Sequence, residues 1–187
     1  FKILTGASLL VWGAVDTATV LDCGDNRFGG FTISEAAGHE YGRLAFPEAF
    51  ARSSNVWFAR SVDNIAPREH HRMLLDFGFG RATGARYPGE RDGTLAAPAD
   101  WSSRTQPTIA IGQELAVTPL QLALAVSAIA NGGTLHAPRL VAAVRDPAGP
   151  EERVTAPRAL RRVLPPGIAA IVRRAMSTDR IPEAHIM

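Results

Sequence analysis

Three consecutive polar residues, Ser53, Ser54 and Asn55, interrupt an apolar and otherwise helical stretch, PEAFARSSNVWFARSVDNI. Ser and Asn side chains compete with the backbone for hydrogen bonds, so they are favoured at helix caps and turns. The pattern predicts a helix over residues 47–52, a tight polar turn, and a second helix capped by Ser54 or Asn55. Such a turn would hold Ser53 and Asn55 rigidly between two apolar helices.

Lys2 is the second residue with potential chemistry, because it is the only lysine among 20 Lys plus Arg residues. An arginine keeps its proton, whereas a buried lysine can become neutral and accept a proton from a hydroxyl. A Lys, a Ser and an Asn together suit acyl transfer through a serine nucleophile. On composition alone, a lysine whose ammonium group simply reaches the surface is the simpler explanation of Lys2.

The other candidate residues indicate no metal or phosphate site. His70 and His71 are neighbours on an expected helix, where adjacent side chains point to different faces. The segment FGFGRATG follows a helix rather than a strand and lacks the P-loop lysine, which favours a helix stop and a turn. The single cysteine, Cys23, excludes an internal disulfide and a cysteine-built metal site. The remaining histidines are His39, His136 and His185.

The length of 187 residues and the 46% hydrophobic content fit one globular domain or a large piece of one. The net charge of +2 is nearly balanced, and we expect no nucleic-acid partner. No apolar run approaches the roughly 18 to 20 residues that span a bilayer. Because Phe1 already stands in an apolar helical pattern, we expect the chain to be cut upstream, so a missing targeting segment says nothing about compartment.

The first half of the chain predicts helices and short strands around the polar turn. FKILTGASLLVWGAV indicates a largely buried helix that ends near Gly13. VLDCG and RFGGFTIS are typical of short strands around turns. PREHHRMLLDFGF predicts a helix that directs Met73, Leu74 and Phe77 inward and stops at Gly78. The Gly- and Pro-rich residues 78–109 predict a long ordered loop.

The second half centres on TPLQLALAVSAIANGG, which has a capping-box pattern of Thr118 and Gln121. Since this segment is apolar nearly all round, we expect its helix at the centre of the fold. TLHAPRLVAAVRDPAG favours extended segments with a turn at residues 146–149. LPPGIAAIVRRAM predicts a last helix with an Arg-bearing face. The chain should therefore be mainly helical, with small β pieces.

Several of these stretches resemble one family in their order and spacing. Phe1 and Lys2 look like the end of the S-x-x-K motif of penicillin-binding proteins, whose serine would lie two residues upstream of Phe1, and Ser53-Ser54-Asn55 looks like their S-x-N motif. The further stretches are GHEYGRLAFPEAFARSSNVWFA, LLDFGFGRATG, YPGERDG and AIGQELAVTPLQLALAVSAIANGGTLHAPRLV. Together they are similar to the transpeptidase domain of class B penicillin-binding proteins, over about residues 1–145 and 164–176.

This resemblance implies an α+β fold of the penicillin-binding protein transpeptidase and serine β-lactamase type. Helices would cover an antiparallel sheet, and a helical lobe with few strands would carry the turn. The chain also departs from the family, because the nucleophilic serine and the K-T-G motif are absent and Phe46-Pro47 replaces the usual LT-type helix start. We therefore expect residues 1–187 to be a partial transpeptidase domain that starts inside S-x-x-K, ends before K-T-G and is inactive as it stands.

The resemblance further implies a role for each site residue. Lys2 would be the general base that takes the proton of the nucleophilic serine, and Ser53 would pass that proton toward the departing D-alanine amine. Asn55 would bind the amide of the donor peptide and help to orient Lys2, so that Ser53 and Asn55 face Lys2 across a cleft. Ser54 would be dispensable for the reaction. No metal or organic cofactor is implied.

The implied reaction is the cross-linking of peptidoglycan stem peptides by a D,D-transpeptidase through an acyl-serine, which β-lactams would trap. In this family the domain works outside the cytoplasm, anchored to the cell membrane, beside a glycan-polymerising membrane partner. Two alternatives remain. The first is a serine β-lactamase or β-lactam sensor, which also uses an S-x-x-K motif. The second is a degenerate non-catalytic scaffold domain, which would need no nucleophile.

Overall fold

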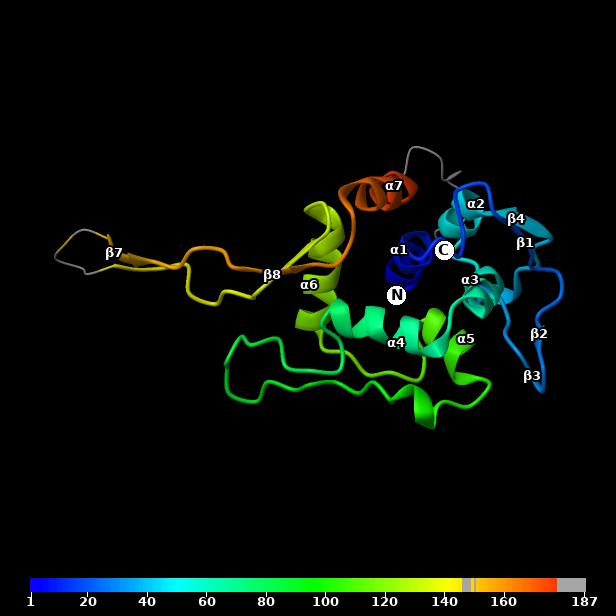
Figure 1. Cartoon of the computed structure of the whole chain (residues 1–187), viewed down its shortest axis with the longest axis horizontal. Coiled ribbons are helices and arrows are strands. Elements are labelled where there is room, and N and C mark those ends of the chain that lie inside the picture. The colour runs from blue at the N-terminus through cyan, green and yellow to red at the C-terminus, as the bar shows by residue number, and fades with distance from the viewer. Residues whose placement is uncertain (146–148, 150, 178–187) are drawn as a thin grey trace.

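The structure is a computed structural model that describes residues 1–145, 149 and 151–177. Its body is a set of helices around α1 (Lys2–Val11), against which α2 (Phe46–Ala51), α3 (Asn55–Ser61) and α7 (Pro166–Met176) pack (Figure 1). The inner residues of α1, Leu4, Ala7 and Leu9, have at most 1% of their surface exposed. The helix that begins at Lys2 is therefore held on several sides, as its apolar sequence predicts.

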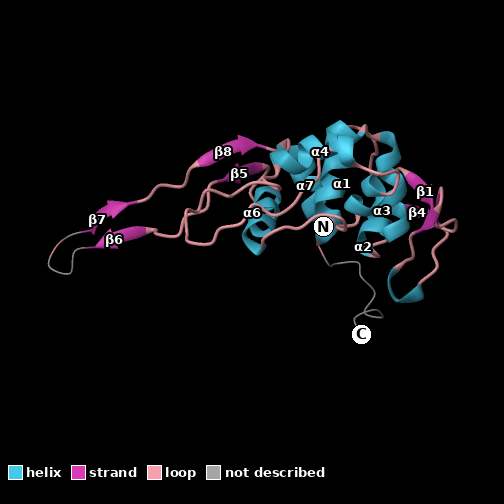
Figure 2. Ribbon diagram, turned by 90° about the horizontal axis from the view of Figure 1, so that it is seen from below, coloured by secondary structure: helices cyan, strands magenta, loops and turns pink. Residues whose placement is uncertain are grey.

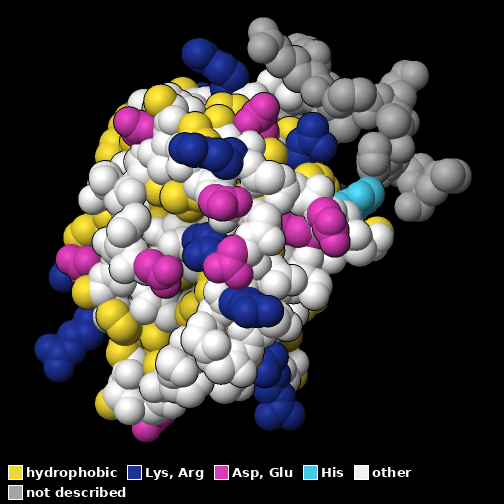
Figure 3. Space-filling model, turned by 90° about the vertical axis from the view of Figure 1, so that its right-hand side faces the viewer, with side chains coloured by type: hydrophobic (Ala, Val, Ile, Leu, Met, Phe, Trp, Pro, Cys, Tyr) yellow, Lys and Arg dark blue, Asp and Glu magenta, His cyan; other side chains and the backbone are white. Residues whose placement is uncertain are grey.

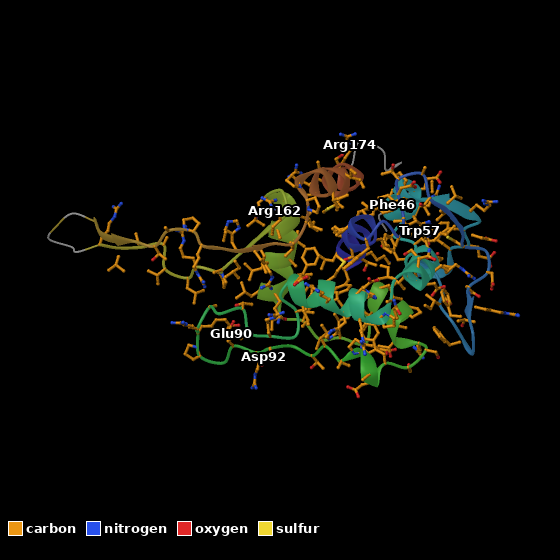
Figure 4. All side chains as sticks on the ribbon, viewed as in Figure 1. Phe46, Trp57, Glu90, Asp92, Arg162 and Arg174 are labelled. Atoms are coloured by element: carbon orange, nitrogen blue, oxygen red, sulfur yellow. The ribbon has the colours of Figure 1, made fainter. Side chains whose placement is uncertain are left out.

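An aromatic cluster joins α2 to α3 directly beneath the polar turn. Phe46 packs against Trp57 with ring centroids 5.6 Å apart, and Phe50 packs against Phe58 at 5.9 Å. Figure 4 labels Phe46 and Trp57 close together in the region of these two helices. A side chain on Gly6 would lie 2.7 Å from the Phe50 ring, so the glycine allows α1 to approach this cluster closely. The start of α1 and the turn are positioned by one packed core.

The strands form four two-stranded antiparallel ladders rather than one broad sheet in the described residues. β1 (Val20–Asp22) pairs with β4 (Arg43–Ala45), and β2 (Arg27–Phe28) pairs with β3 (Phe31–Thr32). β5 (Thr134–His136) pairs with β8 (Ala159–Arg162), and β6 (Ala143–Arg145) with β7 (Glu151–Val154). These last two ladders form an arm that projects from the helices (Figures 1 and 2). The turn predicted at residues 146–149 lies outside the described residues except for Gly149.

The predicted mixture of helices and short antiparallel strands is confirmed. The first helix ends before Gly13, which has φ +65°, and α4 (Pro67–Asp76) buries Met73 and Leu74 before Gly78, at φ +97°. The last helix, α7, carries Arg173 and Arg174 in its final turn. The short helical turns are η1 (Ala36–Gly38), η2 (Val62–Asn64) and η3 (Pro98–Asp100). No helix in the described residues has the length and apolarity that crossing a bilayer requires.

The loop prediction for residues 78–109 is wrong at its end, where α5 (Thr105–Ala110) forms and packs on α3. The segment TQPTIA has weak helix formers, so tertiary packing rather than local propensity decides its state. The remainder of the loop is anchored by Gln121, whose side-chain amide donates to the carbonyls of Arg81 and Asp92, each at 2.8 Å. Figure 4 shows Asp92 on this loop.

The central position expected for α6 (Pro119–Ala130) is also wrong. Its capping box is present, with the Thr118 hydroxyl accepting from the Gln121 amide at 3.1 Å. The helix buries Ala125, Ala128 and Ile129 on one face, whereas Leu122 on another is 37% exposed. A segment that is apolar all round gives no signal for which face is covered, and this explains the error.

Two substitutions on α6 distinguish these positions. We expect Leu122→Ala to lower the free energy of unfolding by about 1 kcal/mol, below the roughly 2–5 kcal/mol of a fully buried leucine, because Leu122 is 37% exposed. Ile129→Val should cost about 1 kcal/mol, since Ile129 is 1% exposed. Urea denaturation of both variants is the measurement. If Leu122→Ala lowers the free energy of unfolding by roughly 2 kcal/mol or more, the value for a core leucine, α6 lies at the centre of the fold after all.

Candidate active site

The polar turn is a helix C-terminal motif followed at once by a helix N-cap. After α2 ends, the Ser54 amide donates to the Ala49 carbonyl at 3.0 Å and the Ser53 amide donates to the Phe50 carbonyl at 3.2 Å. This pair of bonds defines a Schellman motif, in which the residue at the Ser53 position adopts a left-handed conformation and is usually glycine. Ser53 has φ +53°. A serine in this conformation is strained, and strained residues of this kind concentrate at functional sites.

Lys2 and Ser53 meet although they lie 51 residues apart in the chain. The Lys2 ammonium group donates to the Ser53 carbonyl at 2.7 Å and to the Ser53 hydroxyl at 3.0 Å. The first contact is made to a backbone carbonyl of the left-handed residue, and the second requires a side chain that glycine lacks. The structure therefore brings together two of the three predicted site residues, in a geometry that allows a proton to pass between them.

The environment of Lys2 favours its neutral form. Burial lowers the pKa of Lys2 from its ordinary value, because a half-buried ammonium group loses part of its hydration. The negative charge of Glu35 acts in the opposite direction and raises the pKa of Lys2. At a given pH, a larger fraction of Lys2 is therefore neutral than of an exposed lysine, and only the neutral amine can accept a proton.

Asn55 begins α3, but it does not bond to Lys2. Its side-chain amide donates to the Ser34 carbonyl at 2.7 Å, and its backbone amide donates to Glu35 at 2.5 Å. Among the described residues, no hydrogen bond joins Asn55 to Lys2. The predicted contribution of Asn55 to the orientation of Lys2 stays a prediction, and the direct contact of Lys2 in this structure is with Ser53.

Ser54 is fully buried and caps α3, which decides between the two capping residues that the sequence left open. Its hydroxyl accepts from the Trp57 amide at 3.1 Å and donates to Glu35 at 2.5 Å. Loss of such a cap costs about 1 kcal/mol, and the Glu35 oxygen would also lose a partner. Ser54 therefore matters for stability, while its dispensability in the reaction stays a prediction. Glu35 was not identified from the sequence, because the residues that it contacts lie about 20 positions away and no local sequence pattern indicates these contacts.

A cavity of about 620 Å³ lies next to this turn, lined by Ser34, Glu35 and Val56 together with residues of the two adjoining loops. Lys2 and Ser53 are not among its lining residues. The face that carries β1 to β4 shows acidic and basic side chains interspersed (Figure 3). Within the described ranges, which leave out His185, no three His, Cys, Asp or Glu side chains gather in a metal-binding group.

Comparing Ser53→Gly with Ser53→Ala tests the backbone conformation of residue 53 independently of its hydroxyl group. We expect Ser53→Gly to be about 1 kcal/mol more stable than Ser53→Ala, because only the glycine adopts φ +53° without strain. Both variants lose the hydroxyl that contacts Lys2. Chemical denaturation of the two proteins at pH 7 is the measurement. Equal stability of the two variants would show that the left-handed turn is absent in solution.

The chain matches one protein family over nearly its whole length. Residues 1–184 match the family model described as the penicillin binding protein transpeptidase domain. The chain is 30% identical over 165 residues to penicillin-binding protein PbpB of Mycolicibacterium smegmatis, covering 88% of this chain and 26% of that protein. It is 34% identical over 146 residues to the peptidoglycan D,D-transpeptidase FtsI of Escherichia coli, covering 76% and 24%. The chain thus spans about a quarter of the length of these curated relatives.

Solved structures share this fold. The apo form of penicillin binding protein 3 from Mycobacterium tuberculosis superposes with a TM-score of 0.85 at 30% identity, covering 98% of this chain and 42% of that chain. The complex of the same protein with aztreonam gives a TM-score of 0.84. The α+β fold of this family, expected from the resemblance, is confirmed.

Proposed function

The chain belongs to the penicillin-binding protein transpeptidase domain family, and from that premise we propose that it supplies the lysine and the S-x-N turn of a peptidoglycan D,D-transpeptidase. The observation that carries the proposal is the pair of contacts from Lys2 to the carbonyl and hydroxyl of Ser53. A half-buried lysine with a lowered pKa, held against a hydroxyl, is the arrangement that proton transfer needs.

In the proposed reaction, a serine two residues before Phe1 in a longer protein is the nucleophile. Its oxygen attacks the carbonyl of the penultimate D-alanine of a stem peptide, and Lys2 takes the serine proton. Ser53 passes a proton to the amine of the terminal D-alanine as that residue leaves. The acyl-serine is then attacked by the amine of a second stem, which forms the cross-link and restores the serine. Asn55 binds the amide of the donor stem.

We base the proposed substrates, ligands and cellular location on the relatives of this chain. The Escherichia coli relative carries peptidoglycan D,D-transpeptidase in its name, and the Mycobacterium tuberculosis structure holds aztreonam. We assign peptidoglycan stem peptides as substrates and β-lactams as trapping ligands. The domain is proposed to act outside the cytoplasm, anchored to the cell membrane, beside a glycan-polymerising partner. Residues 1–187 would be a partial transpeptidase domain, inactive without the serine and the K-T-G motif.

The test uses the longer protein and this chain side by side. The longer protein should release D-alanine from a stem pentapeptide, form a cross-linked product with an amine acceptor, and gain the mass of a penicillin on one serine. This chain alone should gain no mass. Rapid release of penicilloate without cross-linking would identify a β-lactamase instead. Absence of any adduct on the longer protein would identify a non-catalytic domain.

A further inference from the structure

Glu35 has the burial and contacts of a residue with a specific task. It lies between β3 and η1, is 9% exposed, and belongs to none of the motifs that mark the site. One carboxylate oxygen accepts from the Ser54 hydroxyl at 2.5 Å and from the Val56 amide at 3.3 Å. The other accepts from the Asn55 amide at 2.5 Å. A buried carboxylate is costly unless it is hydrogen-bonded in this way.

These bonds hold the turn where α3 begins. The Schellman bonds fix the backbone up to Ser54, and Glu35 fixes the three residues that follow Ser53. The neighbouring Ser34 carbonyl receives the Asn55 side chain. Residues 34–35, about 20 positions earlier in the chain, therefore hold the Asn55 side chain directly and hold the backbone that immediately follows Ser53.

We propose that Glu35 is a positioning residue for the site: its carboxylate holds the turn so that the Ser53 hydroxyl meets Lys2 and the Asn55 side chain keeps its orientation. The catalytic meaning of this inference rests on the proposed function. Its structural part, the coupling of Glu35 to the turn and to Lys2, does not.

Three substitutions test whether the shape or the charge of the Glu35 side chain matters. Glu35→Ala removes the hydrogen bonds and the charge together. Glu35→Gln keeps the shape and one carbonyl oxygen for the Asn55 amide, and its amide group can donate to the Ser54 hydroxyl. It loses the charge and the weakest of the three hydrogen bonds, the one from the Val56 amide at 3.3 Å. Glu40→Gln is the matched control, because Glu40 is an exposed carboxylate on the same segment.

The first measurement is the second-order rate constant for acylation of the longer protein by a slow β-lactam, taken as a function of pH from about pH 5 to 10. Glu35→Ala should lower it by roughly 10- to 100-fold, because a displacement of about 1 Å at a site costs on this order. Glu35→Gln should move the rising limb of the pH profile to lower pH, since loss of the negative charge lowers the pKa of Lys2. Glu40→Gln should change neither.

The second measurement needs no catalysis. Because Lys2 is the only lysine, ¹³C-lysine labelling of this chain gives one set of signals, whose titration reports Lys2 alone. Its midpoint should fall in Glu35→Gln and stay unchanged in Glu40→Gln. A native acylation rate in Glu35→Ala, or an unmoved midpoint in Glu35→Gln, would overturn the proposal. If the native longer protein is never acylated, the proposed function fails, and the titration still decides the role of Glu35.

Discussion

Replacing Lys2 by arginine in the longer protein is expected to slow its acylation by a β-lactam by roughly 10²- to 10⁴-fold, the usual worth of positioned general-base catalysis. A guanidinium keeps its proton at any workable pH, so it cannot accept one from the serine. The arginine also has a planar, longer head group, which cannot reproduce the contacts of a compact ammonium with the Ser53 carbonyl at 2.7 Å and its hydroxyl at 3.0 Å.

The measurement is the acylation rate constant, taken after circular dichroism confirms that the variant is folded. Arg68→Lys, at an exposed position on α4, is the control and should acylate as the native protein does. A Lys2→Arg variant that acylates at the native rate would exclude the serine-lysine mechanism. It would leave the fold and the family assignment untouched, because neither depends on the protonation state of one side chain.

The turn was predictable from sequence because its chemistry is local. Ser53, Ser54 and Asn55 all compete with helical hydrogen bonds, and the structure places the break between α2 and α3 at these residues. The meeting of Lys2 with Ser53 was not derivable from local pattern, since it depends on how α1 packs against the following helices. It entered only through the resemblance of both segments to one family.

Other features escaped prediction for identifiable physical reasons. Glu35 lies in a segment without periodicity, and its importance comes only from contacts with residues 54–56. The covered face of α6 could not be chosen because the segment is apolar all round. α5 forms from weak helix formers that packing stabilises. In each case the deciding interaction joins residues distant in the chain, where sequence patterns carry little information.

His70 is the second site where a large effect is expected, and it concerns stability rather than chemistry. Its side chain is 1% exposed on α4, and its ring is nearly perpendicular to that of Trp101, with centroids 6.0 Å apart. Neither ring nitrogen has a hydrogen-bond partner among the described residues. Burial, with a smaller effect from the charge of His71, lowers the pKa of His70 to about 4. The folded protein therefore holds this imidazole neutral well into acid.

The direction of the resulting pH dependence follows from proton binding. Because the folded pKa lies below the ordinary value of about 6.5, the unfolded chain binds the proton first, and stability falls as pH drops from 6.5 to about 4. A difference of this size is worth about 3 kcal/mol. Between pH 7 and about pH 4, we expect the free energy of unfolding of the native protein to fall by about 3 kcal/mol more than that of His70→Leu, as measured by urea denaturation.

His71→Leu is the matched control for His70→Leu, because His71 is less buried and its pKa is lowered by burial alone. Its stability should follow the native protein far more closely across the same pH range. Carboxylates titrate equally in all three proteins and cancel in the comparison. Parallel stability curves for the native protein and His70→Leu would show that His70 is hydrated or hydrogen-bonded in solution. If the difference in free energy of unfolding between the native protein and His70→Leu changes only below about pH 6.5, the ordinary pKa of histidine, burial of the neutral imidazole is the cause.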